Sequence, residues 1–129
     1  MLKYVVVGIG GFLGAVARYA LGAYIGGRYG VRFPLGTFVI NVSGSFLIGL
    51  VLTLLARTTA SAHWRYLIPI GFIGAYTTFS TFEYETLRAI QDGQLMTGFL
   101  NIALSLVIGF IAVWAGAGRR KWEVDISSE

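Results

Sequence analysis

The residues in this sequence that could do chemistry are amides and hydroxyls set inside apolar stretches. Thr37, Asn41 and Ser45 follow one another at i, i+4 spacing, which places them on one face of a helix. Asn101 and Ser105 repeat this spacing further along the chain. An amide in hydrocarbon must hydrogen-bond to something, and asparagine has two N–H donors to offer. Each of these polar stripes, Thr37-Asn41-Ser45 and Asn101-Ser105, therefore either joins neighbouring helices or supplies hydrogen bonds to a polar solute.

A second unusual stretch, residues 71–85, interrupts an apolar segment with glycines, hydroxyls and carboxylates. Gly71, Gly74 and the pair Thr77 and Thr78 weaken helix propensity, so the stretch predicts a break or an unwound turn. In hydrocarbon a break is tolerated only where neighbouring protein or a water-lined cavity satisfies the freed backbone groups. Free carbonyl oxygens at such a break suit a hard cation such as sodium. The stretch is therefore a candidate conduction or binding site.

Two phenylalanines and an acid follow this predicted break on one helix face. Phe79 and Phe82 are three residues apart, and Glu85 lies three further on. Aromatic pairs at this spacing usually pack together, but a ring edge carries the positive part of the quadrupole and can attract an anion without a full charge. Glu85 could be solvated near a helix end or act as a gate or proton-linked group. The sequence alone leaves both interpretations open.

One charge lies inside the first apolar segment. Arg18 is roughly two thirds of the way along it, where an unpaired charge is costly. It could snorkel or pair with neighbouring groups, or it could attract an anion into a vestibule. Gly10 and Gly14 form a small-xxx-small pair in the same segment, which is typical of closely packed membrane helices. We therefore expect the first helix to pack closely against its neighbours.

The composition is that of a membrane protein. Of the 129 residues, 56% are hydrophobic and 12% are charged, and the mean hydropathy is +0.72. Four apolar segments each reach the ~20 residues that a membrane-spanning helix needs. We expect an all-α membrane protein with a single four-helix transmembrane domain, its third helix broken near mid-membrane, and a charged tail at 118–129 in water. The four predicted spans lie at about 4–27, 35–56, 64–90 and 95–117.

The charge pattern and the motifs exclude several classes of function. The formal charge of +4 does not indicate nucleic-acid binding, because the Lys and Arg residues lie at helix ends and form no stripe on a polar face. The one basic run, Arg119-Arg120-Lys121, is a topology signal beside a membrane span. The sequence has no cysteine, and no nucleotide-binding loop, nucleophile–base pair or metal-ligand cluster is visible. We therefore expect neither an enzyme nor a nucleic-acid-binding protein.

Basic residues are balanced between the two sides that four spans define. With the tail run left out, three lie on each side: Lys3, Arg57 and Arg65 against Arg28, Arg32 and Arg88. This balance fixes no orientation under the positive-inside rule, so the chain could insert both ways. One protomer has few helices with which to enclose a pathway. We therefore expect an antiparallel, dual-topology homodimer in which the two helix breaks meet near mid-bilayer.

Taken together, these residues resemble the Fluc-type fluoride channels, also called the CrcB family. The resemblance covers essentially the whole chain and is carried by Arg18 and two motifs. The motifs are Gly71-x-x-Gly74-x-x-Thr77-Thr78-Phe79-Ser80-Thr81-Phe82-x-x-Glu85 and Gly36-Thr37-x-x-x-Asn41-x-x-Gly44. The resemblance implies a dual-topology antiparallel dimer with two parallel fluoride pores and a sodium ion, Na+, at the dimer centre.

The resemblance also implies a role for each matching residue. The backbone carbonyls of Gly74 and Thr77, from both protomers, would hold the sodium ion, and Arg18 would belong to the vestibule. An amide, ring edges, hydroxyls and a carboxyl group would line the fluoride pore. These pore residues are Asn41, Phe79, Phe82, Ser105, Thr37, Thr78, Thr81 and Glu85.

The chain departs from the usual family pattern in two places. Ala75-Tyr76 bears on the geometry of the implied sodium site, and Asn101 bears on the chemistry of one pore segment. The implied function is passive, selective export of fluoride across the plasma (inner) membrane of a prokaryote, driven by the negative cell interior. One rival is a small dual-topology proton-coupled drug antiporter that uses Glu85 as its exchanging acid. Another is a non-transporting membrane scaffold, in which Asn41 and the stripe hydroxyls only join helices.

Overall fold

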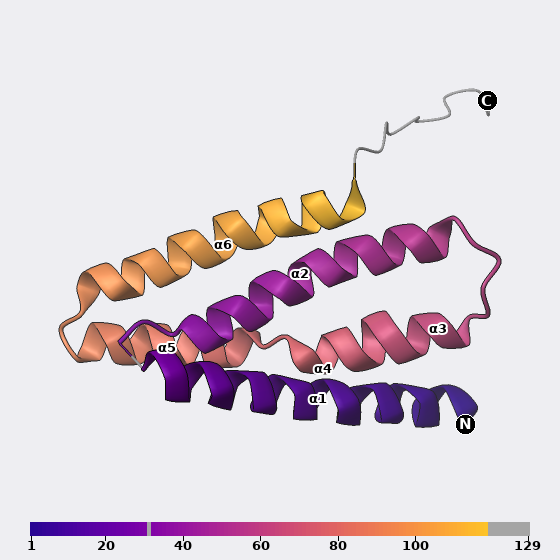
Figure 1. Cartoon of the computed structure of the whole chain (residues 1–129), viewed down its shortest axis with the longest axis horizontal. Helices are drawn as coiled ribbons and strands as arrows, with labels where there is room; N and C mark the ends of the chain where they lie inside the picture. The colour runs from indigo at the N-terminus through magenta and orange to yellow at the C-terminus, as the bar shows by residue number, and fades with distance from the viewer. Residues whose placement is uncertain (31, 119–129) are drawn as a thin grey trace.

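The computed structural model describes residues 1–30 and 32–118, and every regular element within them is helical (Figure 1). The predicted all-α class is confirmed over this part of the chain. The predicted charged tail and its basic run, Arg119-Arg120-Lys121, lie beyond the described residues, apart from Gly118. The elements are α1 (Leu2–Tyr29), α2 (Leu35–Ala56), α3 (His63–Arg65), η1 (Tyr66–Ile73), α4 (Gly74–Tyr76), α5 (Phe79–Gln91) and α6 (Leu95–Ala117).

Three of these helices, α1, α2 and α6, are long and apolar enough to cross a membrane. Helices α2 and α6 have the same bounds as the apolar segments 35–56 and 95–117, while α1 extends past the segment 4–27 at both ends. Figure 1 shows the three helices along the long axis of the molecule. The N-terminus and the α2–α3 connection lie at one end, and the α5–α6 connection lies at the other.

The remaining apolar segment is built from four shorter helical pieces, α3, η1, α4 and α5. Pro69 lies inside η1, which is a π-helix. Proline has no N–H to donate and its ring clashes with a regular α-helical turn, so the wider π turn accommodates it. Thr77 (φ −80°, ψ 155°) and Thr78 (φ −149°, ψ 113°) are extended and separate α4 from α5. The N–H of Thr81 donates to Thr78 Oγ1 at 3.3 Å, which caps the start of α5.

Several glycines lie where the backbones of two helices approach each other. A Cβ atom at Gly10 or Gly14 of α1 would collide with the backbone of η1, where the carbonyl of Phe72 faces Gly14. A Cβ atom at Gly49 of α2 would collide with the carbonyl of Val113 in α6. The chain therefore forms two close helix pairs, α1 with η1 and α2 with α6, in which backbone approaches backbone.

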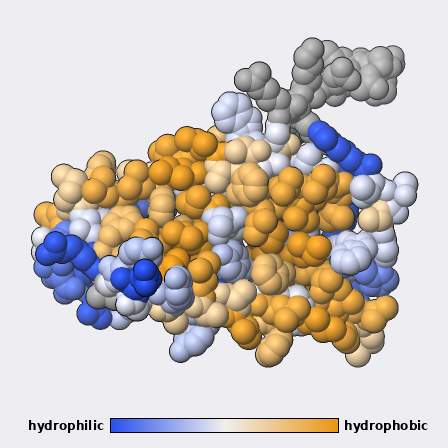
Figure 2. Space-filling model, in the orientation of Figure 1, coloured by the Kyte–Doolittle hydropathy of each residue, from blue (hydrophilic) through white to orange (hydrophobic). Residues whose placement is uncertain are grey.

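Most large apolar side chains lie on the surface of the single chain. Phe12 of α1 is 69% exposed and Phe110 of α6 is 75% exposed, whereas the buried large side chains are few. Figure 2 shows hydrophobic residues over the middle of the molecule and hydrophilic ones gathered at its two ends. An apolar belt between polar ends fits contact with lipid or with a further protein chain.

We predict that Gly14→Ala destabilises the protein by about 1–3 kcal/mol, because its new methyl group would overpack the η1 backbone. Gly8→Ala in the same helix is the matched control, since a Cβ there meets nothing within 4 Å. The measurement is the temperature at which half of the detergent-solubilised protein loses its monodisperse peak in size-exclusion chromatography. Equal midpoints for the two variants would contradict the close α1–η1 contact.

Candidate functional site

Asn41 of α2 holds the extended residues between α4 and α5. Its Nδ2 donates to the carbonyl oxygen of Thr78 at 2.9 Å, and the N–H of Thr78 donates to its Oδ1 at 2.8 Å. One side chain thus satisfies both polar groups of a residue that has left the helix. Nδ2 carries two hydrogens, so one remains for another acceptor.

This pairing releases carbonyl oxygens of the preceding turn. In a continuous helix the N–H of Thr78 would donate to Gly74 O, but here it donates to Asn41. The N–H of Thr81 would likewise donate to Thr77 O, but it donates to Thr78 Oγ1. The two carbonyls that the family resemblance implies as sodium ligands therefore both lose their regular helical partners. Uncharged carbonyl oxygens are ligands that a hard cation such as sodium accepts, so this donor set fits the ion.

Arg18 reaches the same turn from α1. Its Nε donates to the carbonyl oxygen of Ala75 at 3.0 Å, across 57 residues of sequence. This contact is the paired arrangement that the sequence left open for Arg18, and it supplies a charged donor to a carbonyl just before the extended residues. A role for Arg18 in attracting an anion stays a prediction.

A cavity of about 270 Å³ lies beside the extended residues. The rings of Phe79 and Phe82 stand at its wall with centroids 5.7 Å apart and planes at 42°, and Phe82 is 7% exposed while Phe79 is 67% exposed. None of the described residues that line it is charged. The lining residues are Asn41, Gly44, Ser45, Ile48, Ile73, Thr77, Thr78, Phe79, Phe82, Ser105 and Leu106. The cavity thus offers amide, hydroxyl and aromatic groups without a formal charge.

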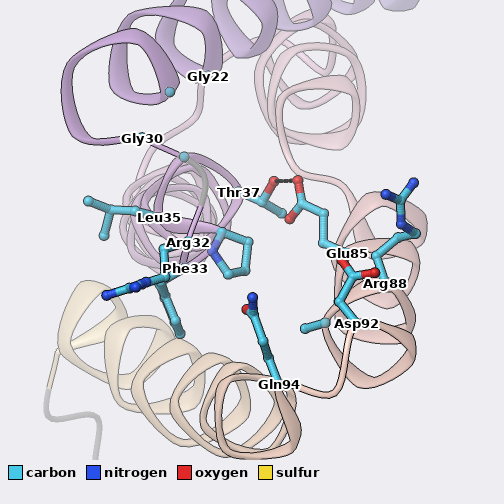
Figure 3. A pocket seen from close by; sticks show the side chains of 14 residues that line it. Gly22, Gly30, Arg32, Phe33, Leu35, Thr37, Glu85, Arg88, Asp92 and Gln94 are labelled. Carbon is cyan, nitrogen blue, oxygen red and sulfur yellow. Dashed lines mark hydrogen bonds between the residues drawn. The ribbon is translucent and has the colours of Figure 1, made fainter.

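A larger cavity of about 680 Å³ opens at the end of the molecule that carries the α5–α6 connection. In Figure 3, Thr37 and Glu85 point toward each other, and the Thr37 hydroxyl donates to Glu85 Oε1 at 2.9 Å. Within the described part of the chain, the buried second oxygen, Oε2, has no hydrogen-bond partner. Arg32 lies across the cavity from Arg88. The cavity is therefore polar and carries charges of both signs.

The structure separates the predicted site residues into two groups. Asn41, Thr78, Phe79, Phe82 and Ser105 line the smaller cavity, and Thr37 and Glu85 line the larger one. Thr81 lines neither of these two cavities, and its hydroxyl accepts from Thr78 Oγ1 at 3.0 Å. The two cavities follow one another along α2 and α5, because Thr37 and Asn41 are one turn apart, as are Phe82 and Glu85.

Three residues of these surroundings were missed by the sequence analysis. Arg88 and Asp92 line the larger cavity, and their spacing from Glu85 on one helix face was a usable signal. Thr86 is 6% exposed and accepts a hydrogen bond from Asn101 Nδ2 at 2.8 Å. Nothing in the pattern around Thr86 indicated that bond, because its partner lies on another helix.

We predict that Asn41→Leu lowers the stability of the protein by about 2–5 kcal/mol, because two backbone groups of Thr78 then lose their partner in a low-dielectric setting. The matched control is Ser45→Ala, which removes a hydroxyl from the same cavity one turn further along α2. Thermal unfolding of both variants, followed by circular dichroism in detergent, measures the difference. Melting of Asn41→Leu at the temperature of the control would show that the Asn41–Thr78 pair contributes little.

Comparison with known proteins shows the family of the chain. Residues 5–117 match the family model described as CrcB-like protein, Camphor Resistance (CrcB). A fluoride-specific ion channel FluC of Acidobacterium capsulatum is 60% identical over 116 residues, which cover 89% of this chain and 93% of that protein. The proteins of the same name from Solibacter usitatus and Sulfurihydrogenibium sp. are 48% and 39% identical over 117 residues, covering 90% of this chain and 96% and 94% of theirs. On this similarity, together with the glycine-rich turn and its paired asparagine, the chain belongs to the CrcB family.

Proposed function

We propose that this chain is a channel that lets fluoride pass down its electrochemical gradient, and that it is not an enzyme. Its similar proteins carry the name fluoride-specific ion channel. The observation that carries the proposal is the smaller cavity, where the Asn41 amide, the Ser105 hydroxyl and the rings of Phe79 and Phe82 meet and no described lining residue is charged.

The chemistry of this cavity suits a small, strongly hydrated anion. A pore must replace the water around fluoride with other donors, and the free hydrogen of Asn41 Nδ2 and the cavity hydroxyls can do so. Ring edges add a weak attraction, because the positive part of the quadrupole lies there. Neutral groups also release the ion quickly, whereas a buried Lys or Arg would trap it.

The larger cavity serves as the entrance of the proposed route. Arg32 and Arg88 line it together with Glu85 and Asp92, and the two guanidinium groups offer local attraction to an anion from water. Thr37 and Glu85, which are hydrogen-bonded to each other, line the same cavity one helical turn from Asn41 and Phe82. In this route an ion moves along α2 and α5, one turn at a time, from the polar end of the molecule to the phenylalanines. Passage driven by the negative interior of a prokaryotic cell would carry fluoride outward across the plasma membrane.

We further propose that the segment 63–91 forms the fourth membrane span and that two chains assemble as an antiparallel homodimer. Gly74 and Phe79 are exposed on the single chain, at the place where the helix is interrupted. Backbone and polar side-chain groups that are exposed at membrane depth need hydrogen-bond partners, which a second protein chain can supply and lipid tails cannot. A two-fold axis in the membrane plane would bring two interruptions together, with one pore on each side of the axis.

The dimer also gives the proposed sodium ion enough ligands. The carbonyl oxygens of Gly74 and Thr77 lack their regular helical partners in each chain, so two chains would offer four such oxygens. The ion would stabilise the dimer by neutralising carbonyl dipoles that point toward one another. None of the described residues that line the cavity beside Thr77 carries a carboxylate, which favours a monovalent ion over calcium or magnesium.

One observation favours the rival proton-coupled antiporter. Glu85 lies in a predicted span, where the exchanging acid of an antiporter would have to lie, and its buried Oε2 has no hydrogen-bond partner among the described residues. The two functions differ in their driving force. An antiporter moves its substrate only against protons, whereas the channel needs no proton gradient.

We predict that liposomes containing the purified protein release fluoride when no proton gradient is imposed, and that Phe79→Ile or Phe82→Ile lowers this release by at least about tenfold. Phe12→Ile, on an exposed face of α1, should release fluoride at the wild-type rate. A fluoride electrode measures the efflux, and chloride-loaded liposomes give the selectivity control. Undiminished efflux from both cavity variants would remove the phenylalanines from the mechanism, and absence of efflux from the wild type would reject the channel.

We also predict that replacing sodium with N-methyl-D-glucamine during purification lowers the thermal midpoint of the dimer, since a bound ion stabilises the folded assembly by mass action. Adding sodium back should restore the midpoint, and potassium, which is larger, should restore it less. Gel filtration with light scattering separates dimer from monomer at each temperature. A midpoint that is the same in all three salts would argue against a cation on the Gly74 and Thr77 carbonyls.

A further inference from the structure

A row of three hydrogen bonds runs from α5 to α6 and ends at the smaller cavity. The hydroxyl of Thr86 donates to the carbonyl of Phe82 at 2.8 Å, and Asn101 Nδ2 donates to Thr86 Oγ1 at 2.8 Å. The hydroxyl of Ser105 donates to Asn101 Oδ1 at 3.3 Å, and Ser105 lines the cavity. Asn101 is 2% exposed and Thr86 is 6% exposed, so these two side chains bond to each other rather than to solvent.

The hydroxyl hydrogen of Thr86 determines which groups in this row donate and which accept. Thr86 has one hydroxyl hydrogen, and because the Phe82 carbonyl accepts it, Thr86 Oγ1 can only accept from Asn101. The amide of Asn101 must therefore turn its NH2 group to Thr86 and its oxygen to Ser105. Ser105 then gives its only hydrogen to Asn101 and presents oxygen lone pairs to the cavity. An anion that arrives there meets an acceptor instead of a donor.

We propose that Asn101 is a positioning residue. It keeps the hydroxyl hydrogen of Ser105 turned away from the anion route until an anion accepts a hydrogen bond from that hydroxyl. This inference rests on the proposed fluoride function. No covalent bond changes in the step: the Ser105 O–H rotates from Asn101 Oδ1 toward the anion and returns when the anion leaves.

The geometry favours such an exchange. The Ser105–Asn101 contact, at 3.3 Å, is longer than the 2.8 Å contacts that hold Asn101 and Thr86, so it is the weakest bond of the row. While the anion holds the Ser105 hydrogen, Asn101 Oδ1 is buried and lacks its partner. The unpaired Oδ1 therefore competes with the anion for the Ser105 hydroxyl hydrogen, which weakens the hydrogen bond between Ser105 and the anion. Asn101 thereby limits how tightly Ser105 binds an ion, which rapid passage requires.

Two substitutions outside the cavity lining should release the Ser105 hydrogen by different means. Asn101→Leu removes the acceptor, and Thr86→Val removes the hydroxyl that fixes the amide, so that Asn101 can turn its NH2 group to Ser105. Each should lower the fluoride concentration at half-maximal flux by about three- to tenfold, the range of one ordinary hydrogen bond, while the maximal flux falls. Thr97→Val, one turn before Asn101 on α6, is the matched control and should leave both quantities unchanged.

The test is a double-mutant cycle with Ser105→Ala, measured as fluoride efflux from liposomes over a range of fluoride concentrations. If Asn101 acts through Ser105, Asn101→Leu and Thr86→Val have no further effect on the half-maximal concentration when residue 105 is alanine. Shifts of undiminished size in that background, or no shift in the single variants, would overturn the proposal and leave Asn101 as a contact between helices. If Asn101→Leu does not fold, the double-mutant cycle of Thr86→Val with Ser105→Ala still tests the proposal, because valine has nearly the same shape as threonine. Wild-type efflux in the same assay decides the proposed function separately.

Discussion

The pair of hydrogen bonds between Asn41 and the peptide groups of Thr78 is the contact on which the rest of the structure depends. An extended residue inside an apolar segment exposes an N–H and a C=O, and each costs several kcal/mol in hydrocarbon if it is left unpaired, about the whole stability of a small domain. The asparagine amide satisfies both groups at 2.8 and 2.9 Å. By taking the Thr78 N–H, it also leaves Gly74 O free, so one side chain both stabilises the interruption and creates a potential ligand.

Other contacts hold the same turn from further sides. Arg18 donates to the Ala75 carbonyl from α1, and the hydroxyls of Ser43 and Tyr76 lie 2.9 Å apart between α2 and α4. The turn is thus fixed by side chains of α1 and α2 that lie far away in sequence. Such fixed surroundings suit an ion route, because pore groups held in place need little reorganisation when an ion passes.

The sequence predicted the all-α class, since helical periodicity and the length of apolar segments are local properties. The family was recognised from the resemblance of Arg18 and two motifs, at residues 36–44 and 71–85. It also identified Asn41 as a residue that must hydrogen-bond, but it could not name the backbone of Thr78 as the partner, because spacing gives the face of a helix and not what that face meets. Thr86 was missed for the same reason: a lone threonine in an amphipathic stretch carries no signal of its bond to Asn101. The close approach of α1 to the π-helix that contains Pro69 joins residues far apart in the sequence, which no local pattern contains.

We propose that the cavity beside Asn41, none of whose described lining residues is charged, conducts fluoride and excludes chloride. The reversal potential of the current through a planar bilayer tests it most directly, with a tenfold fluoride gradient across the membrane and equal chloride on both sides. A fluoride-selective pore should reverse close to the fluoride equilibrium potential, about 59 mV from zero for a monovalent ion. A reversal potential that stays at zero under the fluoride gradient, or that follows an imposed chloride gradient, would contradict the account.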